Sequence, residues 1–414
     1  KEAEWIESAL HDEDAALDAL RSEIEASDTT SLGIKLRKAK RRIALLTGLG
    51  DLSGAWTLEQ VTLALSDFAN LAVDITARRL IADEIERGSI PGLTSGDVET
   101  AGGFVAIAMG KMGAGELNYS SDIYLICLFD DSRFDPSDIA EVRSRFVRVT
   151  RKLTSVISEP TGEGYVFRTD LRLRPDPSVT PVCLSMDAAE RYYEAEGRTW
   201  ERGAFIKASV SGGDIEAGQA FLERLTPFVW RKHLDFAAIE DAHDMRLRIR
   251  DHKGFHGPIQ LPGHNMKLGR GGIREIEFFA QTRQLIAGGR DPSLRARGTV
   301  PALQALANAG WIEQSLSETL NDHYRWHRTI EHRLQMINDA QTHDLPSDDN
   351  GFNRLAAFMD TDTSSLKDEL FSRLTVVHDL TEGFFAPQEG DEFSESPSDW
   401  GAEVTAQWPR YPAL

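Results

Sequence analysis

Apolar side chains recur at helical spacing through residues 1–95 of the chain. Thr57 and Gln60 form a capping-box pair, which is typical of the start of a helix. One continuous apolar stripe follows and predicts a long helix: Leu58, Val61, Leu65, Phe68, Leu71 and Ile75. Gly88 and Pro91 interrupt the pattern, so residues 1–95 are predicted to form an N-terminal helical region.

Short apolar runs replace the helical pattern in the next region, residues 96–213. The stretches GFVAIAMG (residues 103–110) and DIYLICLF (residues 122–129) predict two buried strands. The alternating stretch GYVFRTDLRLRP, residues 164–175, predicts a third strand that ends at its proline. A helical pattern over residues 135–158 lies between the second and third strands. The region is therefore predicted to be a small α/β core.

Helical periodicity returns after this core. Several stretches with apolar stripes and short loops between them, one of them over residues 236–252, predict a helical bundle over residues 214–385. The final segment, residues 386–414, is acidic and rich in proline and serine, so we expect a linker or a tail. A chain of 414 residues is longer than one core usually serves. The predicted fold class is α+β, with the core flanked by two helical regions.

Charge and cysteine content narrow the classes of function. A formal net charge of -20 argues against a general nucleic-acid binder, because phosphate contacts need an excess of lysine and arginine. No apolar run approaches the roughly 18 residues that a membrane span needs, and the N-terminus does not have the pattern of a signal peptide. Cys127 and Cys183 lie in apolar surroundings and are expected to be reduced, which favours a cytoplasmic protein.

A glycine-rich loop, MGKMGAGELNYSSD, follows the first predicted strand. Gly110, Gly113 and Gly115 would let backbone N–H groups approach phosphate oxygens. Lys111 adds a positive charge to the same loop. The loop is not a Walker A motif, because it does not have the required G-x-x-x-x-G-K-[ST] pattern. A strand-to-helix turn that happens to contain glycine remains the alternative.

Two acidic residues lie on the predicted strands beside this loop. Asp122 begins the second strand, directly after Ser121, and Asp170 lies inside the third. Carboxylates on adjacent strands can share a Mg²⁺ ion, which prefers oxygen ligands. Arg172 and Arg174 are expected on the same strand face as Asp170, where they could hold a phosphate. The combination favours a phosphate-handling site over separate ion pairs.

The loop and its surroundings resemble a known family. GKMGAGELNYSSDIYLI is similar to the G-K-x-G-x-x-E-L-N-x-x-S-D-h-D-h signature of glutamine synthetase adenylyltransferase/deadenylylase, a member of the nucleotidyltransferase superfamily. The blocks TDLRLRP, YYEAEGRTWERGAFIKA, NMKLGRGGIREIEFFAQ and EHRLQMINDAQTHDLP resemble further parts of the family in the same order. The resemblance spans about residues 102–346 and implies a nucleotidyltransferase-type core. The form KLGRGGIREIEF is similar to the N-terminal half of this bifunctional enzyme, so the chain would be a fragment or a shortened relative.

The resemblance implies that the chain removes AMP from a tyrosine of glutamine synthetase, with orthophosphate as acceptor and ADP as product. It assigns metal-binding roles to Asp122 and Asp170 and implies two Mg²⁺ ions. The residues that would contact the nucleotide or its phosphates are Gly110, Lys111, Gly113, Gly115 and Ser121, with Arg172, Arg174, Arg202 and Lys207 as further candidates. Glutamine synthetase and the PII signalling protein would be partners, together with ADP, ATP or AMP and orthophosphate. No nucleic acid or membrane partner is expected.

Tyr124 departs from the family pattern. It stands where the D-h-D pair has its second acid, on the same strand face as Asp122. A phenol has a pKa near 10 and is a poor ligand for a hard cation, so the metal site is expected to be impaired. Two other functions remain open: a regulatory module that binds nucleotide or PII without turnover, and an adenylyltransferase that uses ATP.

Other polar residues have simpler interpretations. His323 and His327 lie at i and i+4 with Glu331 one turn further, but the apolar face of the same stretch favours a structural role over a zinc site. The remaining histidines follow no ligand pattern. Glu275 and Glu277 follow two glycines at a predicted helix start, where they could favour the helix dipole or contribute a carboxylate to the site.

Overall fold

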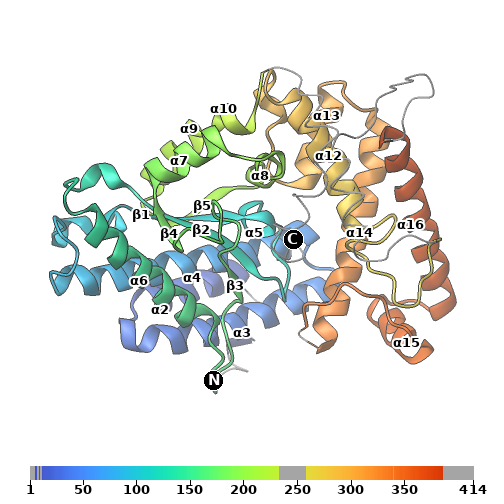
Figure 1. Ribbon diagram of the computed structural model, residues 1–414. Helices are drawn as coiled ribbons and strands as arrows, with labels where there is room; N and C mark the ends of the chain where they lie inside the picture. The colour runs from blue at the N-terminus through green and yellow to red at the C-terminus, as the bar shows by residue number, and fades with distance from the viewer. Residues whose placement is uncertain (1–4, 7–8, 10–11, 233–257, 339, 386–414) are drawn as a thin grey trace.

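The computed structural model in Figure 1 describes residues 5–6, 9, 12–232, 258–338 and 340–385. A small mixed β-sheet lies at its centre, with helices over both faces and a helical bundle beside one end. The predicted α+β class is therefore confirmed. The helix predicted over residues 236–252 and the tail predicted over residues 386–414 lie outside the described residues. The domain boundaries expected from the sequence stay predictions.

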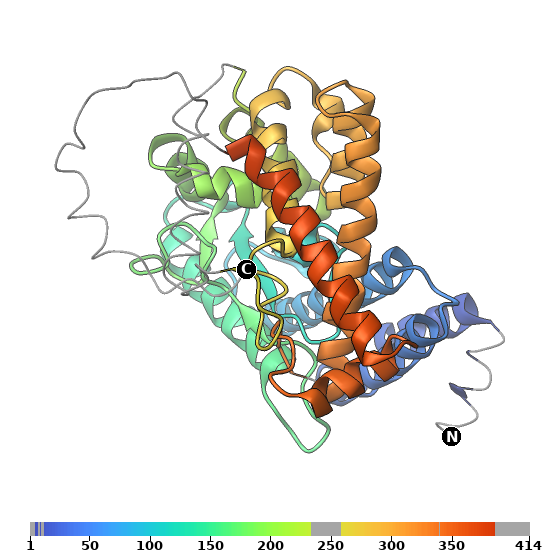
Figure 2. The same cartoon turned by 90° about the vertical axis from the view of Figure 1, so that its right-hand side faces the viewer.

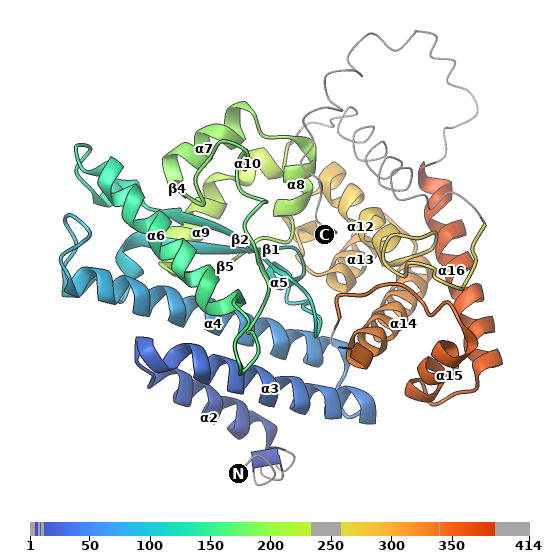
Figure 3. The same ribbon diagram turned by 60° about the horizontal axis from the view of Figure 1, so that its bottom comes forward.

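Three helices form the N-terminal region in the described part of the chain: α2 (Glu13–Glu25), α3 (Thr29–Ser53) and α4 (Leu58–Glu86). The predicted capping box is confirmed, because the Thr57 side chain accepts from the backbone of Gln60 while Gln60 accepts from the Thr57 backbone. Figure 3 shows α4 running beneath the sheet with α3 and then α2 below it. The apolar stripe of α4 thus forms part of the core under the sheet.

The described sheet contains five strands: β1 (Phe104–Met109), β2 (Ile123–Phe129), β3 (Thr169–Asp170), β4 (Cys183–Ser185) and β5 (Ser209–Gly213). Its order is β3-β2-β1-β5, and β3 and β4 pair with successive stretches of β2. β1 is antiparallel to β2 and β5, whereas β2 is parallel to β3 and β4. The first two predicted strands are confirmed as β1 and β2.

The predicted third strand is wrong in its extent. It was expected over residues 164–175, but only Thr169–Asp170 pairs as a strand. Beyond it the chain turns into a loop, because the Arg174 guanidinium donates to three backbone carbonyl oxygens of this loop at 2.9–3.0 Å. Arg172 and Arg174 consequently do not share a strand face with Asp170.

Each face of the sheet is covered by a different set of helices. Helices α4 and α6 (Ile139–Ser158) cover one face, where Phe146 of α6 stacks on Phe129 of β2 with ring centroids 5.2 Å apart. The other face packs against four shorter helices: α7 (Met186–Ala195), α8 (Thr199–Phe205), α9 (Ile215–Arg224) and α10 (Thr226–Val229). Tyr124 lies on this second face.

The C-terminal bundle contains five longer helices in the described residues: α12 (Ile273–Ala287), α13 (Thr299–Asn308), α14 (Gln314–Asn338), α15 (Asp349–Phe358) and α16 (Thr363–Phe385). Figure 2 shows α16 crossing in front of the other bundle helices. His327 is fully buried in α14, and its Nε2 donates to the Gly271 carbonyl at 2.9 Å. Burial lowers its pKa to about 3, so this ring is neutral and holds the loop before α12.

Both cysteines are buried and free, as the sequence predicts. Cys127 and Cys183 face each other in the register of β2 and β4, and burial raises the pKa of Cys127 to about 12. They are therefore neutral thiols of the core. None of the described helices combines the length and the apolar character that crossing a membrane requires.

We predict that Gly271→Ala destabilises the protein far more than Gly263→Ala. Both glycines have positive φ, +69° and +72°, so both alanines meet the same backbone strain of roughly 1–2 kcal/mol. A Cβ at Gly271 would also lie 1.8 Å from the Leu374 carbonyl oxygen of α16, whereas nothing lies within 4 Å at Gly263. Denaturant unfolding should show an additional loss of about 1–3 kcal/mol for Gly271→Ala. Equal losses would contradict this close contact.

Candidate active site

The expected site residues lie at the end of the sheet where β1 ends and β2 begins. Tyr124 of β2 and Asp170 of β3 are direct partners in the parallel register, and Asp122 precedes Ile123, the first residue of β2. Asp122 and Asp170 thus lie at the ends of two neighbouring strands, β2 and β3. Tyr124 follows Asp122 by two residues on β2. The bundle helices α12 and α14 lie beside this end of the sheet.

The glycine-rich loop is a tight turn into the short helix α5 (Gly110–Gly113). Gly110 and Gly115 have φ of +60° and +73°, a region that other residues rarely adopt. A Cβ at Gly113 would lie 2.1 Å from the Lys207 carbonyl oxygen, so this position requires glycine for packing. A tight strand-to-helix turn therefore explains why these positions are glycine, and their role in phosphate binding stays a prediction.

Each predicted metal ligand is paired with an arginine. Arg168 Nε lies 2.6 Å from Asp122 Oδ1, and Arg172 Nη2 lies 2.5 Å from Asp170 Oδ2. The hydrogen bonds with Asp170 raise the pKa of Arg172. These guanidinium groups stand in for the positive charge that a bound cation would supply to the carboxylates. Arg168 was not predicted from the sequence, although it stands two residues before Asp170.

Tyr124 is a neutral side chain between these charges. Its exposed fraction is 6%. Burial raises the pKa of its phenol, and the negative charges of Asp170 and Asp122 raise it further, while Arg172 and Arg274 oppose the shift. The phenol therefore stays protonated at neutral pH and adds no negative charge to the pair of carboxylates.

This donor set fits one Mg²⁺ better than two. Asp122 and Asp170 supply carboxylate oxygens, the ligands that Mg²⁺ prefers, and water or phosphate oxygens could complete an octahedral shell. In the part of the chain that the structure describes, no group of three acidic, histidine or cysteine side chains is arranged to hold a metal ion. A second Mg²⁺ would need a further carboxylate, and the expectation that the family has one at the position of Tyr124 stays a prediction.

The other predicted phosphate ligands have structural partners. Arg174 is bound to its own loop, and Arg202 is 1% exposed in α8 with its Nε 3.5 Å from the Val229 carbonyl oxygen. Lys111 Nζ lies 2.9 Å from Glu331, and Lys207 Nζ lies within 2.8 Å of two carboxylates, one of them on α12. Arg172 pairs directly with Asp170, and the charge of Asp170 also acts on Arg174, whose guanidinium is bound to its own loop.

Lys207 joins the sheet to the bundle. Its ammonium lies 2.8 Å from both Glu116 Oε2 and Glu277 Oε1 and 3.3 Å from the Thr299 hydroxyl. Although burial opposes the charged form, these two carboxylates raise the pKa of Lys207. Burial likewise opposes the charge of Glu277, but Lys207 and Arg274 hold its pKa well below the usual range. Glu277 is thus part of the ion-paired network that joins the sheet to the bundle.

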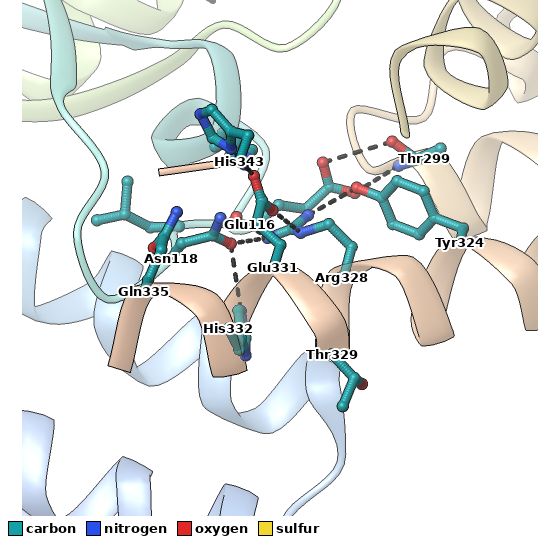
Figure 4. A network of polar contacts seen from close by, with 12 residues as sticks. Glu116, Asn118, Thr299, Tyr324, Arg328, Thr329, Glu331, His332, Gln335 and His343 are labelled. Atoms are coloured by element: carbon teal, nitrogen blue, oxygen red, sulfur yellow. Dashed lines mark hydrogen bonds and ion pairs between the residues drawn. The ribbon is translucent and has the colours of Figure 1, made fainter. Parts of the chain in front are cut away.

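A second group of buried charges lies along α14 (Figure 4). Arg328 donates to the Glu116 carbonyl at 2.6 Å and to the Tyr324 hydroxyl at 2.7 Å, and it also contacts Asn118. Glu331 receives Lys111 Nζ at 2.9 Å and Arg328 Nε at 3.1 Å. The loop that contains the family signature is therefore fixed to α14 by paired polar groups.

Further contacts extend this group. His332 Nε2 lies 3.2 Å from Asn118 Oδ1, and its Nδ1 lies 2.9 Å from Asp51 of α3. Gln335 accepts from the Ser120 backbone N–H at 3.1 Å. These roles were not predicted, since polar residues on a helix usually face solvent. The available signal was the resemblance of the EHRLQ block to the family, which gave no reason for its polar residues.

Comparison with known proteins identifies the family. The profile of the glutamate-ammonia ligase adenylyltransferase family matches residues 3–224. The chain belongs to this family. A second profile, GlnD PII-uridylyltransferase, matches residues 243–385.

Curated relatives agree over most of the chain. The bifunctional glutamine synthetase adenylyltransferase/adenylyl-removing enzyme of Bradyrhizobium sp. (strain ORS 278) is 48% identical over 372 residues, 89% of this chain and 37% of that protein. Its counterpart in Rhizobium meliloti (strain 1021) is 48% identical over 344 residues, 83% of this chain and 35% of that protein. The chain thus spans less than half the length of these relatives, and it matches their N-terminal half.

We predict that Lys207→Met costs about 3–5 kcal/mol of unfolding free energy, because it leaves Glu116 and Glu277 buried without their shared cation. Arg325→Met is the control. Its ion pair with Glu59, at 2.6 Å, is about half exposed, so the loss should stay below about 1 kcal/mol. Denaturant unfolding at neutral pH measures both variants. Similar small losses would contradict the structural role of Lys207.

The same network predicts that the free energy of unfolding decreases at acidic pH. The folded pKa of Glu277 lies below its ordinary value of 4.5, so its contribution is present above about pH 4.5 and is lost as the pH falls further. Lys207→Met removes a main cause of that low pKa. The variant should therefore lose less additional stability than the parent between about pH 4.5 and pH 3. Parallel curves of unfolding free energy against pH would contradict this prediction.

Proposed function

We propose that the chain is the adenylyl-removing part of a glutamine synthetase adenylyltransferase/adenylyl-removing enzyme, with its metal site impaired by Tyr124. The observation that carries the proposal is the register of Tyr124 and Asp170 beside Asp122. The match to the N-terminal half of bifunctional relatives supports it. The substrate is glutamine synthetase that carries AMP on a tyrosine.

In the proposed reaction, an oxygen of orthophosphate forms a bond to the phosphorus of AMP, and the bond from that phosphorus to the tyrosine oxygen breaks. The tyrosine oxygen takes up a proton, and ADP leaves. Asp122 and Asp170 would hold the Mg²⁺, once Arg168 and Arg172 release them. Mg²⁺, when bound, withdraws negative charge from the transferred phosphoryl group.

The residues of this chain do the positioning. Arg172 is half exposed, so it can exchange Asp170 for a phosphate oxygen with little loss of packing. The backbone N–H groups of the loop from Gly110 to Gly115 are the proposed contacts for the nucleotide phosphates. Tyr124 leaves the site one carboxylate short. Losing one preorganised electrostatic group costs roughly 2.7–4 kcal/mol, or a factor of 10²–10³ in rate.

A regulatory module is the second candidate. The match of residues 243–385 to the PII-uridylyltransferase profile favours a contact with the PII protein in this part of the chain. On this reading the chain binds nucleotide or PII without turnover. An adenylyltransferase that uses ATP is distinguished by its product, since attachment of AMP releases pyrophosphate. The two free, buried thiols support our placement of the protein in the cytoplasm.

We predict that Tyr124→Asp raises Mg²⁺-dependent phosphorolysis of adenylylated glutamine synthetase by at least about 10²-fold. Aspartate is smaller than tyrosine and keeps the side chain on the same strand face, opposite Asp170. The assay measures ADP formed from orthophosphate and AMP-modified glutamine synthetase, with and without Mg²⁺.

Tyr124→Asn is the matched control, because asparagine has the size of aspartate without its charge. It should remain as slow as the parent chain. If Asn and Asp accelerate the reaction equally, relief of steric blocking explains the gain and the metal role of this position is wrong. If neither variant forms ADP while nucleotide or PII still binds, the regulatory module is the better account.

A further inference from the structure

Three positive side chains come from the segments between the sheet and the bundle, and one of them, Arg274, acts on Tyr124 of the candidate site. Arg274 lies in the first turn of α12, and its charge acts on the Tyr124 phenol, so it belongs to the surroundings of that residue. Lys267 comes from the loop before α12, and the charges of Arg274 and Lys111 both act on its ammonium. Lys111 of α5 pairs with Glu331 of α14 at 2.9 Å, and Arg274 pairs with Glu277 of α12 at 3.3 Å, so the three cations belong to the region between the sheet and the bundle.

Lys267 is buried in an unusual way. Its exposed fraction is 4%, and none of the hydrogen bonds and ion pairs between described residues includes its ammonium, although the charges of Glu331 and Glu277 act on it. Burial, together with the positive charges of Lys111 and Arg274, lowers its pKa to about 7, while the charges of Glu331 and Glu277 oppose the shift. Burial of an ammonium is costly when no carboxylate pairs with it directly, so a negatively charged ligand beside Lys267 would be stabilising.

The backbone around Lys267 is fixed before any ligand arrives. Its N–H donates to Asn265 Oδ1 at 3.1 Å, and its carbonyl accepts from the Arg274 N–H at 3.0 Å. The preceding residue, Met266, donates to the His343 carbonyl at 2.7 Å. The backbone of Lys267 is thus held in place by the loop and its neighbours.

The charges near Lys267 do not balance. Among the described residues, three carboxylates in this group face five cationic side chains: Glu116, Glu277 and Glu331 against Lys111, Lys207, Lys267, Arg274 and Arg328. Each carboxylate is already within 4 Å of at least one cation other than Lys267. An excess of buried positive charge remains even when Lys267 is neutral, and an anion would compensate it.

We propose that Lys267, Arg274 and Lys111 form a subsite for a phosphate group on the bundle side of the candidate active site. The inference rests on the proposed function, because it supplies the phosphate that this function needs. A phosphate group matches these donors: the Arg274 guanidinium can donate two parallel hydrogen bonds, and an ammonium acts as a point charge. The first turn of α12, a helix of 15 residues, adds its positive end.

The test is calorimetric titration of the chain as it stands with orthophosphate and, separately, with AMP, at pH 7 and in the absence of other phosphates. Binding needs no turnover, so the Tyr124 form is suitable. We expect Lys267→Met to weaken binding roughly tenfold or more, the value of a charge-assisted hydrogen bond. Arg274→Gln should weaken it similarly. Arg325→Met, a surface variant of α14, should leave it unchanged.

Thermal unfolding separates a binding role from a structural one. Lys267→Met removes an unpaired buried charge and keeps the side-chain length, so its Tm should equal or exceed that of the parent. Lys207→Met, which removes a paired lysine, should lower it. The two substitutions are thus expected to change the Tm in different directions. A lower Tm for Lys267→Met together with unchanged phosphate affinity would assign Lys267 to the packing of the loop and overturn the proposal.

The two ligands identify the source of the phosphate. A Lys267-dependent affinity for orthophosphate assigns the subsite to the attacking group, and one for AMP assigns it to the transferred group. If neither affinity depends on Lys267, or if the parent chain binds neither ligand measurably, the proposed subsite is wrong. If binding depends on Lys267 but Tyr124→Asp never yields ADP, the proposed function fails and the subsite stands. If the Tyr124→Asp variant forms ADP but phosphate binding does not depend on Lys267, the proposed function stands and only the subsite is wrong.

Discussion

The buried ion pairs between the sheet and the bundle are the constraint on which the remaining structure depends. Lys207 is held between Glu116 and Glu277, and Arg328 of α14 joins the same loop through its backbone. Charges that are removed from water must stay paired, so these segments cannot separate without a large cost. The sheet end and the bundle therefore act as one unit, and the relative position of Asp170 and Arg274 follows from it.

This constraint divides the candidate site into two halves. The sheet supplies the carboxylates of Asp122 and Asp170, each neutralised by a neighbouring arginine. The bundle supplies an excess of positive charge around Lys267. A phosphate would compensate the positive charge of the bundle half, and a metal ion would compensate the carboxylates of the sheet half. Tyr124 adds no further carboxylate, so there is less negative charge for a metal ion to compensate. On the proposed function, the site would bind an anion more readily than a metal ion.

The sequence predicted the elements that have a clear period. β1, β2, α6 and the Thr57 capping box follow from local patterns. The third strand is shorter than predicted, because an alternating pattern of apolar and polar residues cannot reveal that Arg174 binds the carbonyls of its own loop. The three-residue strand β4 is too short to give a signal. A lone lysine in a sequence does not disclose that Lys207 pairs with two distant glutamates, and its role in phosphate binding stays a prediction.

The most direct test of this account is a crystal structure of the chain soaked with Mn²⁺ and orthophosphate, with Mn²⁺ located by anomalous scattering. The account predicts one Mn²⁺ between Asp122 and Asp170, with Arg168 and Arg172 displaced from those carboxylates, and a phosphate within hydrogen-bond distance of Lys267 and Arg274. Ion pairs that persist at both carboxylates, with Mn²⁺ and phosphate bound elsewhere or not at all, would contradict it.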